Sequence, residues 1–436
     1  GRGRKGHRLC SLESMLLVKG LRQIVQVVDD ATAFLRGNDM RKIRILESPQ
    51  SDLCILSQDG IISYVGPSNG LPILSPTCVE VDAQNGCAIP SFVDAHTHPV
   101  FAGDRVHEFA MKLAGATYNE VQASGGGIHF TTRRTREASK EELLESFELI
   151  CKRMIHSGTT TIEAKSGYGL DEETEMKMLY VLEEAAKKGP LEISSTFCGA
   201  HAVPIGSDEK AQTELILNTI IPRIEREKAE GQLDSLQNID VFCEKGNFGV
   251  ETTEKILRAG QAIGLHANFH AEELSHIGGT EMGSRIGARA MSHLEHVSDS
   301  DIDSMSLSLS TAVLLPSTAF ILRLQPPPVR KMIDKGVIVA LGSDFNPNAH
   351  CLAMPVIMSL ACVTMFMSME EALVAATLNA AHSIGRGTTH GAIGVGRVCD
   401  VLVLKSSRWE NLIYDIGGHA HQITKVIKRG KIVLEK

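Results

Sequence analysis

The feature that most constrains the fold of this 436-residue chain is a repeated alternation of β-branched runs with longer charged stretches between about residues 90 and 390. Eight candidate strands can be read there, at 92–98, 159–165, 192–200, 238–244, 263–270, 288–294, 311–317 and 337–343. Helix-forming composition fills stretches between them, at 140–156, 172–188, 208–228, 251–262 and 368–384. Eight βα repeats predict an α/β protein with a closed, TIM-like (β/α)8 barrel, in which functional groups gather at the carboxyl ends of the strands.

The two ends of the chain have the alternating apolar pattern of short strands. Apolar alternations at 15–19, 43–46, 53–56 and 61–67 favour a small antiparallel β module, and 400–404 and 425–433 continue the pattern, with Gly430 at a hairpin turn. We expect both ends to pair in one small β-sandwich. The predicted domains are a basic N-terminal arm (1–14), two sandwich segments (15–89 and 391–436) and the barrel (90–390).

Composition excludes several classes of protein. A formal net charge of -8 gives no electrostatic footprint for nucleic acid. No run of about 18 apolar residues predicts a membrane span. The ten cysteines are scattered without paired spacing, which favours a reducing compartment, so the sequence predicts a cytoplasmic protein.

A His-x-His pair ends the first predicted barrel strand. His96 and His98, at i and i+2 on an extended segment, project from the same face and can reach one metal ion. A pair of surface histidines at a strand end is the alternative interpretation. The position at the carboxyl end of a barrel strand favours the metal.

Further polar groups end three later strands. His270, with Glu273 three residues on, ends the fifth; His293 ends the sixth and Asp344 the eighth. His266 competes with His270 as a third ligand, but we expect it to be a buried, hydrogen-bonded histidine deeper in the barrel wall. Histidines and a carboxylate at one rim suit a borderline metal such as zinc or iron, with a water as reactive ligand.

These residues match the sequence motifs of a known family. From about residue 40 to 430 the chain resembles the amidohydrolase superfamily and, within it, the imidazolonepropionase family. Of the motifs that carry the resemblance, the first is typical of the whole superfamily and the later ones are specific to the narrower family. The resemblance is carried by PSFVDAHTH (90–98), ASGGGI (123–128), EAKSGYG (163–169), CGAH (198–201) and SDFNP (343–347).

The resemblance implies a metal-dependent hydrolase with one divalent or trivalent ion, zinc or iron, per chain. His96, His98, His270 and Asp344 would hold the ion, and Glu273 and Asp344 would accept protons from the bound water. His293 would stabilise the developing oxyanion. Other members hold two metals bridged by a carboxylated lysine on the fourth strand. Lys165 lies on the second strand, and Cys243 or Glu244 of the fourth strand could bridge instead. A single metal is preferred, with Glu244 in a supporting position.

The implied substrate is 4-imidazolone-5-propanoate, opened by hydrolysis of its cyclic amide to N-formimidoyl-L-glutamate in histidine degradation. The resemblance puts Arg105, Tyr118 and Tyr168 around the propionate tail, and a guanidinium with phenol donors is a good carboxylate clamp. It also puts His201 and Asn346 at the ring, and suggests a homodimer. The chain departs from the family at 348–350, where Asn-Ala-His replaces glycine and small hydroxyl residues. The family's hydroxyl contact is therefore not carried over there, and Asn348 could offer its amide.

Two other functions are compatible with the barrel. A nucleobase aminohydrolase of the same superfamily would use a similar metal set to expel ammonia, but a bare nucleobase has no tail for the Arg105 clamp. A non-catalytic scaffold is the second alternative. It is disfavoured because the histidines and carboxylates of the site are all present.

Overall fold

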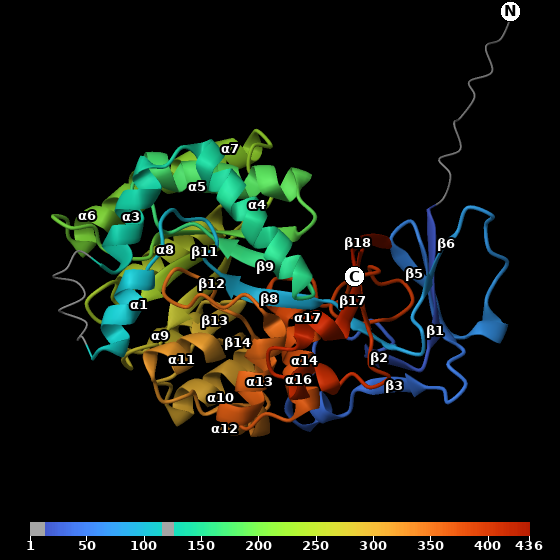
Figure 1. Ribbon diagram of the computed structural model, residues 1–436. Coiled ribbons are helices and arrows are strands. Elements are labelled where there is room, and N and C mark those ends of the chain that lie inside the picture. Colours follow the sequence, from blue (N-terminus) through green and yellow to red (C-terminus); the bar gives the residue numbers. More distant parts are fainter. Residues whose placement is uncertain (1–13, 116–125) are drawn as a thin grey trace, which may run out of the picture.

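The computed structural model describes residues 14–115 and 126–436. Its centre is a sheet of eight parallel strands that neighbour one another in chain order, surrounded by helices (Figure 1). All eight predicted strands are present, and the predicted barrel class is confirmed. The strands are β8 (Phe92–Thr97), β9 (Thr159–Lys165), β10 (Glu192–Ala200), β11 (Leu236–Cys243), β12 (His266–Ala271), β13 (Ala290–His293), β14 (Thr311–Leu314) and β15 (Ile338–Leu341).

The barrel closes between its first strand and the segment that follows its last one. The Asp344 amide donates to the carbonyl of His96 at 2.9 Å, and the His98 amide donates to the carbonyl of Phe345 at 2.8 Å. The main chains that carry three of the predicted ligands are therefore hydrogen-bonded to each other.

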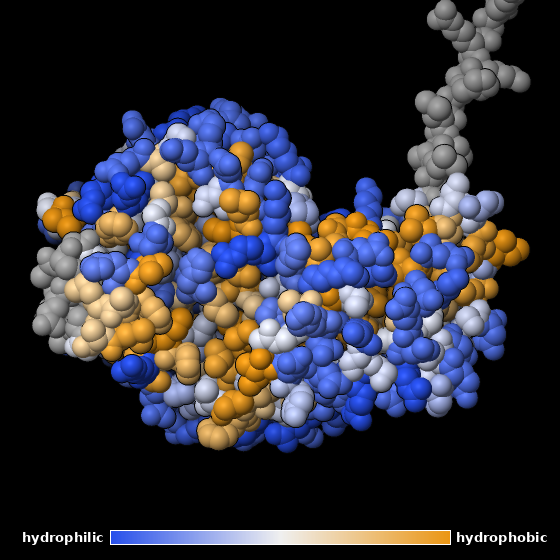
Figure 2. Space-filling model, in the orientation of Figure 1, coloured by the Kyte–Doolittle hydropathy of each residue, from blue (hydrophilic) through white to orange (hydrophobic). Residues whose placement is uncertain are grey.

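Helices cover the outside of the barrel, and two of them match their predicted bounds. In α4 (Lys140–His156), Ser139 and Glu142 form a capping box, and Asp171 caps α5 (Glu172–Lys188). The surface over α4, α5 and α7 is mostly hydrophilic (Figure 2). The other helices are α1 (Val106–Leu113), α3 (Ile128–Glu137), α6 (Glu209–Leu215), α7 (Ile221–Ala229), α8 (Val250–Ala262), α9 (Gly279–Arg285), α10 (Asp299–Ser308), α11 (Pro316–Leu322), α12 (Val329–Asp334), α13 (Met354–Thr364), α14 (Met369–Ala376), α15 (Leu378–Ser383), α16 (Asn411–Tyr414) and α17 (His419–Gln422).

Two predicted helices are interrupted. The helix expected at 208–228 contains a π-helical turn, Ile216–Ile220, just before Pro222, whose ring nitrogen cannot donate to the preceding turn. The helix expected at 368–384 breaks at Thr377, whose backbone leaves the helical region while its hydroxyl donates to the carbonyl of Leu373 at 2.6 Å. The predictions were wrong in continuity but correct in helical character.

The β-sandwich beside the barrel joins both ends of the chain, as predicted. One sheet has the order β5-β4-β1-β6 and the other β18-β17-β16-β7-β2-β3, in which β16 pairs antiparallel with β7. The expectation of a purely antiparallel module was wrong. β1 pairs parallel with β6, and β2 pairs parallel with β7. This is because the chain crosses from each sheet to the other before it returns. The strands are β1 (Met15–Leu21), β2 (Gln23–Val27), β3 (Arg44–Glu47), β4 (Leu53–Gln58), β5 (Ile61–Pro67), β6 (Val79–Asp82), β7 (Cys87–Pro90), β16 (Val401–Leu404), β17 (Ile423–Lys428) and β18 (Lys431–Glu435), with short 3-10 turns at Gly37–Arg41 and Ser68–Gly70.

Apolar packing divides along the same lines. The large core lies between the barrel strands and their helices, and a smaller one fills the sandwich around Leu21, Ile24 and Ile55. Across residues 14–115 and 126–436, none of the helices combines the length and hydropathy needed to cross a bilayer.

Candidate metal centre and active site

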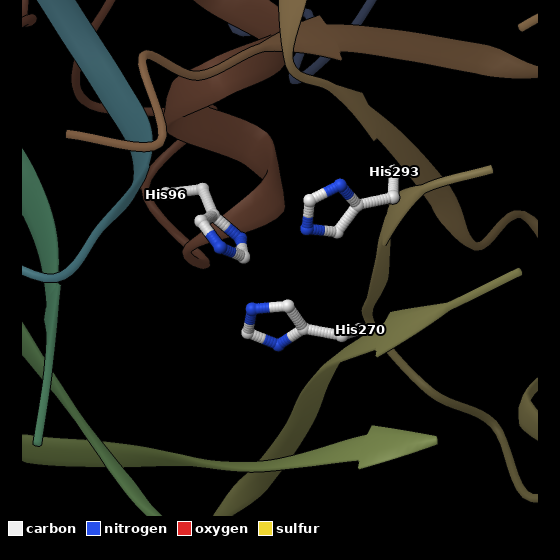
Figure 3. Close-up of side chains that lie close together, drawn as sticks. All are labelled: His96, His270 and His293. Carbon is white, nitrogen blue, oxygen red and sulfur yellow. The ribbon is translucent and has the colours of Figure 1, made fainter. Parts of the chain in front are cut away.

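Histidine rings from three barrel strands meet at the carboxyl end of the barrel. The side chains of His96, His270 and His293 point toward one another from β8, β12 and β13 (Figure 3). Ring centroids lie 4.6 Å apart for His96 and His270, and 5.1 Å for His270 and His293. All three side chains are buried, and one ring nitrogen of each lies within 4.8 Å of the others.

A fourth histidine and a carboxylate complete the group. His98 Nε2 lies 3.2 Å from His96 Nε2, and Asp344 Oδ1 lies 3.5 and 3.6 Å from those two nitrogens. Burial lowers the pKa of both His96 and His98 well below the usual range, so the imidazoles are neutral and their lone pairs are available. Neutral nitrogens converging on a carboxylate oxygen fit a metal cation of the zinc or iron type.

Hydrogen bonds behind two of the rings set their orientation. Ser292 Oγ lies 2.8 Å from His96 Nδ1. Asp240 Oδ1 lies 2.8 Å from His270 Nδ1 and accepts from the His270 amide at 3.1 Å. Because Nδ1 of each ring is engaged, Nε2 is left for the centre, as in other metal sites with an outer hydrogen-bonding partner. Sequence reasoning did not single out Ser292 or Asp240.

Lys165 lies behind Asp240, fully buried. Its Nζ is 2.7 Å from Asp240 Oδ2 and 2.7 Å from Glu163 Oε1, and Glu163 also accepts from Thr196 Oγ1. Burial alone would lower the pKa of Lys165, but the two carboxylates raise it above its usual value. Asp240 shows the opposite balance: burial opposes ionisation, yet His270 and Lys165 hold its pKa below the usual range. The group is thus a lysine ammonium between two carboxylates.

The two fourth-strand alternatives for a bridging ligand lie in other surroundings. Glu244 Oε2 accepts from the amides of Leu274 and Ser275 at 2.9 and 3.3 Å, so this carboxylate holds the loop after β12. Cys243 is buried, and its thiol lies against the backbone of Gly279 in α9. Glu244 therefore has the supporting position that the sequence favoured.

Strained backbone positions two of the site residues. His293 has φ 78° and Asp344 φ 48°, in the left-handed region that residues other than glycine rarely adopt. Such conformations concentrate at functional sites, where surrounding contacts hold them. For Asp344 one contact is Thr318 Oγ1, which donates to Oδ2 at 2.5 Å and leaves Oδ1 facing the histidines.

Two buried carboxyl groups stand beside His293. Glu273 Oε2 lies 3.6 Å from His293 Nε2, and Glu295 Oε2 lies 3.9 Å from His293 Nδ1. Burial, reinforced by the charges of Glu295 and Asp344, raises the pKa of Glu273 well above its usual range, and burial raises that of Glu295 to about 8. A carboxyl group in such surroundings can hold a proton near neutral pH.

Tyr168 and His201 form the wall next to His98. The His201 ring stacks on His98 at 4.7 Å, and the Tyr168 ring lies 5.3 Å from His201 and 6.0 Å from His98. His201 Nδ1 lies 2.9 Å from the Gly167 carbonyl, and burial lowers the pKa of His201 to about 3. The structure therefore brings both predicted substrate residues to the metal centre.

Arg105 lies at the start of α1 beside this wall. Its Nε donates to Thr131 Oγ1 at 3.0 Å, and its Nε lies 3.9 Å from Glu108 Oε2. Burial raises the pKa of Tyr168, and the positive charge of Arg105 partly opposes that rise, so the two side chains are close enough to interact. Tyr118, the third predicted clamp residue, lies outside the described residues.

The side chains of Asn346 and Asn348, in the loop after β15, are engaged in hydrogen bonds within the protein. Asn346 Nδ2 donates to the Asp344 carbonyl at 2.7 Å, and Asn346 Oδ1 accepts from the amides of Asn348 and Ala349 at 2.7 and 3.0 Å. Asn348 Oδ1 accepts from Lys112 of α1 at 2.5 Å. The loop departs from the family sequence at 348–350, and this bond from Lys112 ties it to α1.

Two histidines that the sequence left open lie away from the cluster. The expectation of a buried His266 was wrong: it is the first residue of β12 and is exposed, because four residues before His270 is the opposite end of a short strand. The His350 ring packs on Phe345, with ring centroids 4.8 Å apart.

Comparisons with known proteins agree with this geometry. The amidohydrolase family model matches residues 87–433. Proteins named "Probable imidazolonepropionase" are similar over nearly their whole length: the one from Nematostella vectensis is 50% identical over 97% of this chain and 99% of its own, and the one from Homo sapiens 48% identical over 96% and 98%.

Among solved structures, E. coli guanine deaminase has the same fold, with a TM-score of 0.72 at 18% identity over 97% of this chain and 99% of its own. A triazine hydrolase variant also has a TM-score of 0.72, at 15% identity over 97% and 95% of the two chains. At such identities the likeness concerns the fold alone. The family model and the relatives of about half identity show that this chain belongs to the amidohydrolase family and, within it, groups with the imidazolonepropionases.

Proposed function

We propose that this protein is a hydrolase that opens the cyclic amide of 4-imidazolone-5-propanoate to N-formimidoyl-L-glutamate, a step of histidine degradation. The proposal depends above all on the buried His96, His98, His270 and Asp344 group beside Glu273, in a chain whose relatives of 48–50% identity carry the imidazolonepropionase name. The sequence predictions of a cytoplasmic location and a homodimer stand as predictions.

His96, His98, His270 and Asp344 are the proposed holders of one zinc or iron ion. When bound, such an ion polarises a carbonyl group and lowers the pKa of a coordinated water to about 7. The protein contributes the orientation of the donors. Ser292 and Asp240 engage the Nδ1 atoms of His96 and His270, and Thr318 turns one oxygen of Asp344 inward.

Glu273 is the proposed proton carrier. Its buried carboxyl group, with a pKa well above the usual range, can take a proton from the attacking water and return it to the ring nitrogen that leaves. The water oxygen bonds to the ring carbonyl carbon while the bond between this carbon and the ring nitrogen breaks. One water is consumed, and one amide becomes a carboxylate and an amidine nitrogen.

His293 is the proposed oxyanion donor. Its Nε2 lies 3.6 Å from Glu273, so the imidazole lies at the reacting centre beside the proton carrier. An N–H group fixed there stabilises the negative charge that develops on the carbonyl oxygen.

Arg105 and Tyr168, with Tyr118, are the proposed clamp for the propionate tail, and His201, Asn346 and Asn348 are proposed to contact the ring. A guanidinium beside a phenol is well suited to a carboxylate. The clamp also distinguishes the two candidate substrates, because a nucleobase has no carboxylate tail for the clamp to bind. Both side-chain groups of Asn346 are engaged within the loop, and Lys112 of α1 binds the side-chain oxygen of Asn348. Backbone groups of that loop are therefore the contacts to be tested first.

The test uses one preparation of the full chain. Elemental analysis measures bound metal while the loss of imidazolonepropionate absorbance is followed and the product is identified by mass spectrometry. We expect about one metal per chain and N-formimidoyl-L-glutamate as product. Ammonia release from guanine without imidazolone turnover would favour the aminohydrolase alternative, and metal-free protein that cannot be loaded would refute the ligand set.

A further inference from the structure

We propose that Lys165 is a positioning residue of the metal centre: its ammonium group fixes the Asp240 carboxylate in the one orientation that directs His270 Nε2 at the metal. The inference depends on the proposed function only in taking His270 as a ligand. Lys165 touches neither the metal donors nor the substrate wall directly, and acts through Asp240.

The geometry leaves Asp240 no alternative orientation. Lys165 Nζ is 2.7 Å from Asp240 Oδ2, while Asp240 Oδ1 is engaged by both the ring and the amide of His270. Oδ1 thus accepts from His270 while Oδ2 is held in an ion pair by Lys165, and rotation of the carboxylate would disturb the contacts on both sides. Because Oδ1 can only accept, the His270 ring must carry its proton on Nδ1.

Lys165 is itself fixed from the far side. Glu163 Oε1 lies 2.7 Å from Nζ, and the same oxygen accepts from Thr196 Oγ1. Lys165 is 1% exposed and Glu163 is fully buried, so this ion group is shielded from bulk solvent. The chain of contacts runs from β10 and β9 through β11 to β12, across four neighbouring strands of the barrel wall.

Burying a lysine between two carboxylates costs desolvation free energy, and apolar residues of similar volume often stabilise a fold equally well. The molecule offers a matched lysine for comparison. Lys428, at the opposite end of the barrel, lies 2.5 Å from Asp400 and 3.1 Å from Glu192 and is also buried, but neither carboxylate contacts a histidine of the metal centre. If burial and pairing were the whole role of Lys165, the two lysines would behave alike.

The experiment measures metal binding rather than turnover alone. Metal is removed from the full-length protein with a chelator, and Zn2+ affinity is measured in competition with a chromophoric chelator, while added Co2+ reports the ligand geometry through its visible absorption bands. Lys165→Met is expected to weaken Zn2+ binding about 10- to 100-fold and to change the Co2+ bands, as loss of an outer partner of a ligating histidine does. Lys428→Met should leave both within twofold of wild type.

A double-mutant cycle tests the route of the effect. Asp240→Asn is expected to lose at least as much affinity as Lys165→Met, and the double variant no more than about twofold beyond Asp240→Asn, because Lys165 acts through Asp240. Unchanged Zn2+ affinity and Co2+ bands in Lys165→Met, or losses that multiply in the double variant, would overturn the proposal.

A further variant guards against a folding defect. If Lys165→Met does not fold, as judged by near-ultraviolet circular dichroism, Lys165→Met with Glu163→Gln keeps the net charge of the buried group and should show the same loss of affinity. The same affinity as wild type in this variant would refute the proposal. Wild-type protein that binds no Zn2+ or Co2+ would instead refute the ligand set of the proposed function, so the two failures are distinguishable.

Discussion

The two ends of the barrel use the same kinds of residues in opposite ways. At the amino end of β10, Glu192 lies 2.9 Å from Arg386, 3.1 Å from His390 and 2.8 Å from Arg429. Burial opposes ionisation of Glu192, but these basic neighbours hold its pKa far below the usual range. This end joins barrel to sandwich, because Arg429 follows β17.

At the carboxyl end, Glu273 and Glu295 are buried without such partners. In the described part of the chain, neither side-chain oxygen of Glu295 has a hydrogen bond, and the nearest basic group to Glu273 is His293, at 3.6 Å. Both carboxyl pKa values are raised. Paired charges at one end stabilise the fold, whereas the unpaired carboxyl groups at the other end fit the roles in ligand binding and proton transfer that are proposed for this site.

The largest expected effect would come from Glu273 at the carboxyl end. Glu273→Gln keeps shape and burial but cannot carry a proton, so kcat should fall about 10³-fold, within the range for general acid–base catalysis. Metal content should stay at the wild-type value. Steady-state kinetics with elemental analysis checks both, and full activity in this variant would refute the assigned proton carrier.

At the amino end the expected effect is on stability. Glu192→Gln leaves several cations around a neutral group, and breaking a buried ion network typically costs about 3 kcal/mol. Urea unfolding should show this loss, while kcat of the folded protein stays near wild type. Glu184→Gln is the matched control, because its pairs with Lys140 and Lys188 lie on the surface and should matter by less than about 1 kcal/mol. An activity loss in Glu192→Gln as large as its stability loss would contradict the division between the two ends.

A smaller effect is expected at the substrate wall. Arg105→Ala removes the cation proposed to bind the propionate tail, and KM should rise about 10- to 100-fold, in keeping with about 1.5–3 kcal/mol for a charge-assisted hydrogen bond. The metal content should not change. The sharpest measurement compares the variant and wild type on an imidazolone that lacks the tail: if Arg105 acts on the tail, the two enzymes should be equally slow there.

The smallest effect is the pH dependence of the amino end. The pKa of Glu192 is lower in the folded than in the unfolded chain, where it is about 4.3. The unfolded chain therefore takes up the proton first, and the contribution of Glu192 is fully present above about pH 4.3 and is lost as the pH falls below it. The difference in urea midpoint between wild type and Glu192→Gln should therefore be smaller at pH 3.5 than at pH 7. An equal difference at both pH values would exclude Glu192 as the source.

Much of the fold was predictable because its signals are local. Period and composition located every barrel strand, and the caps Ser139 and Asp171 fixed the starts of α4 and α5. The breaks at 216–220 and Thr377 have local causes, Pro222 and the hydroxyl bond of Thr377, but helix-forming composition averaged over a long stretch does not reveal them. Parallel pairing in the sandwich was missed because it depends on contacts between elements that are distant in the sequence.

The site was predictable only as far as strand ends reveal it. His96, His98, His270, His293 and Asp344 follow strands and were singled out, and the structure brings them together. Asp240 lies within β11 and was not singled out, and Lys165, the last residue of β9, was considered only as a bridging ligand. Their meeting depends on the register of β9, β10 and β11. A usable signal existed, since a charged residue between Ile239 and Val241 in an otherwise apolar strand needs a buried partner.

The closure of the barrel has a consequence for biosynthesis. The Ser343 amide donates to Asp94 at 2.8 Å across a separation of 249 residues, and the neighbouring bonds tie the His96 segment to Asp344. An emerging polypeptide therefore displays His96 and His98 on the ribosome long before their carboxylate partner has been translated. The proposed ligands therefore cannot all be in place until the last βα unit has been made and the barrel has closed.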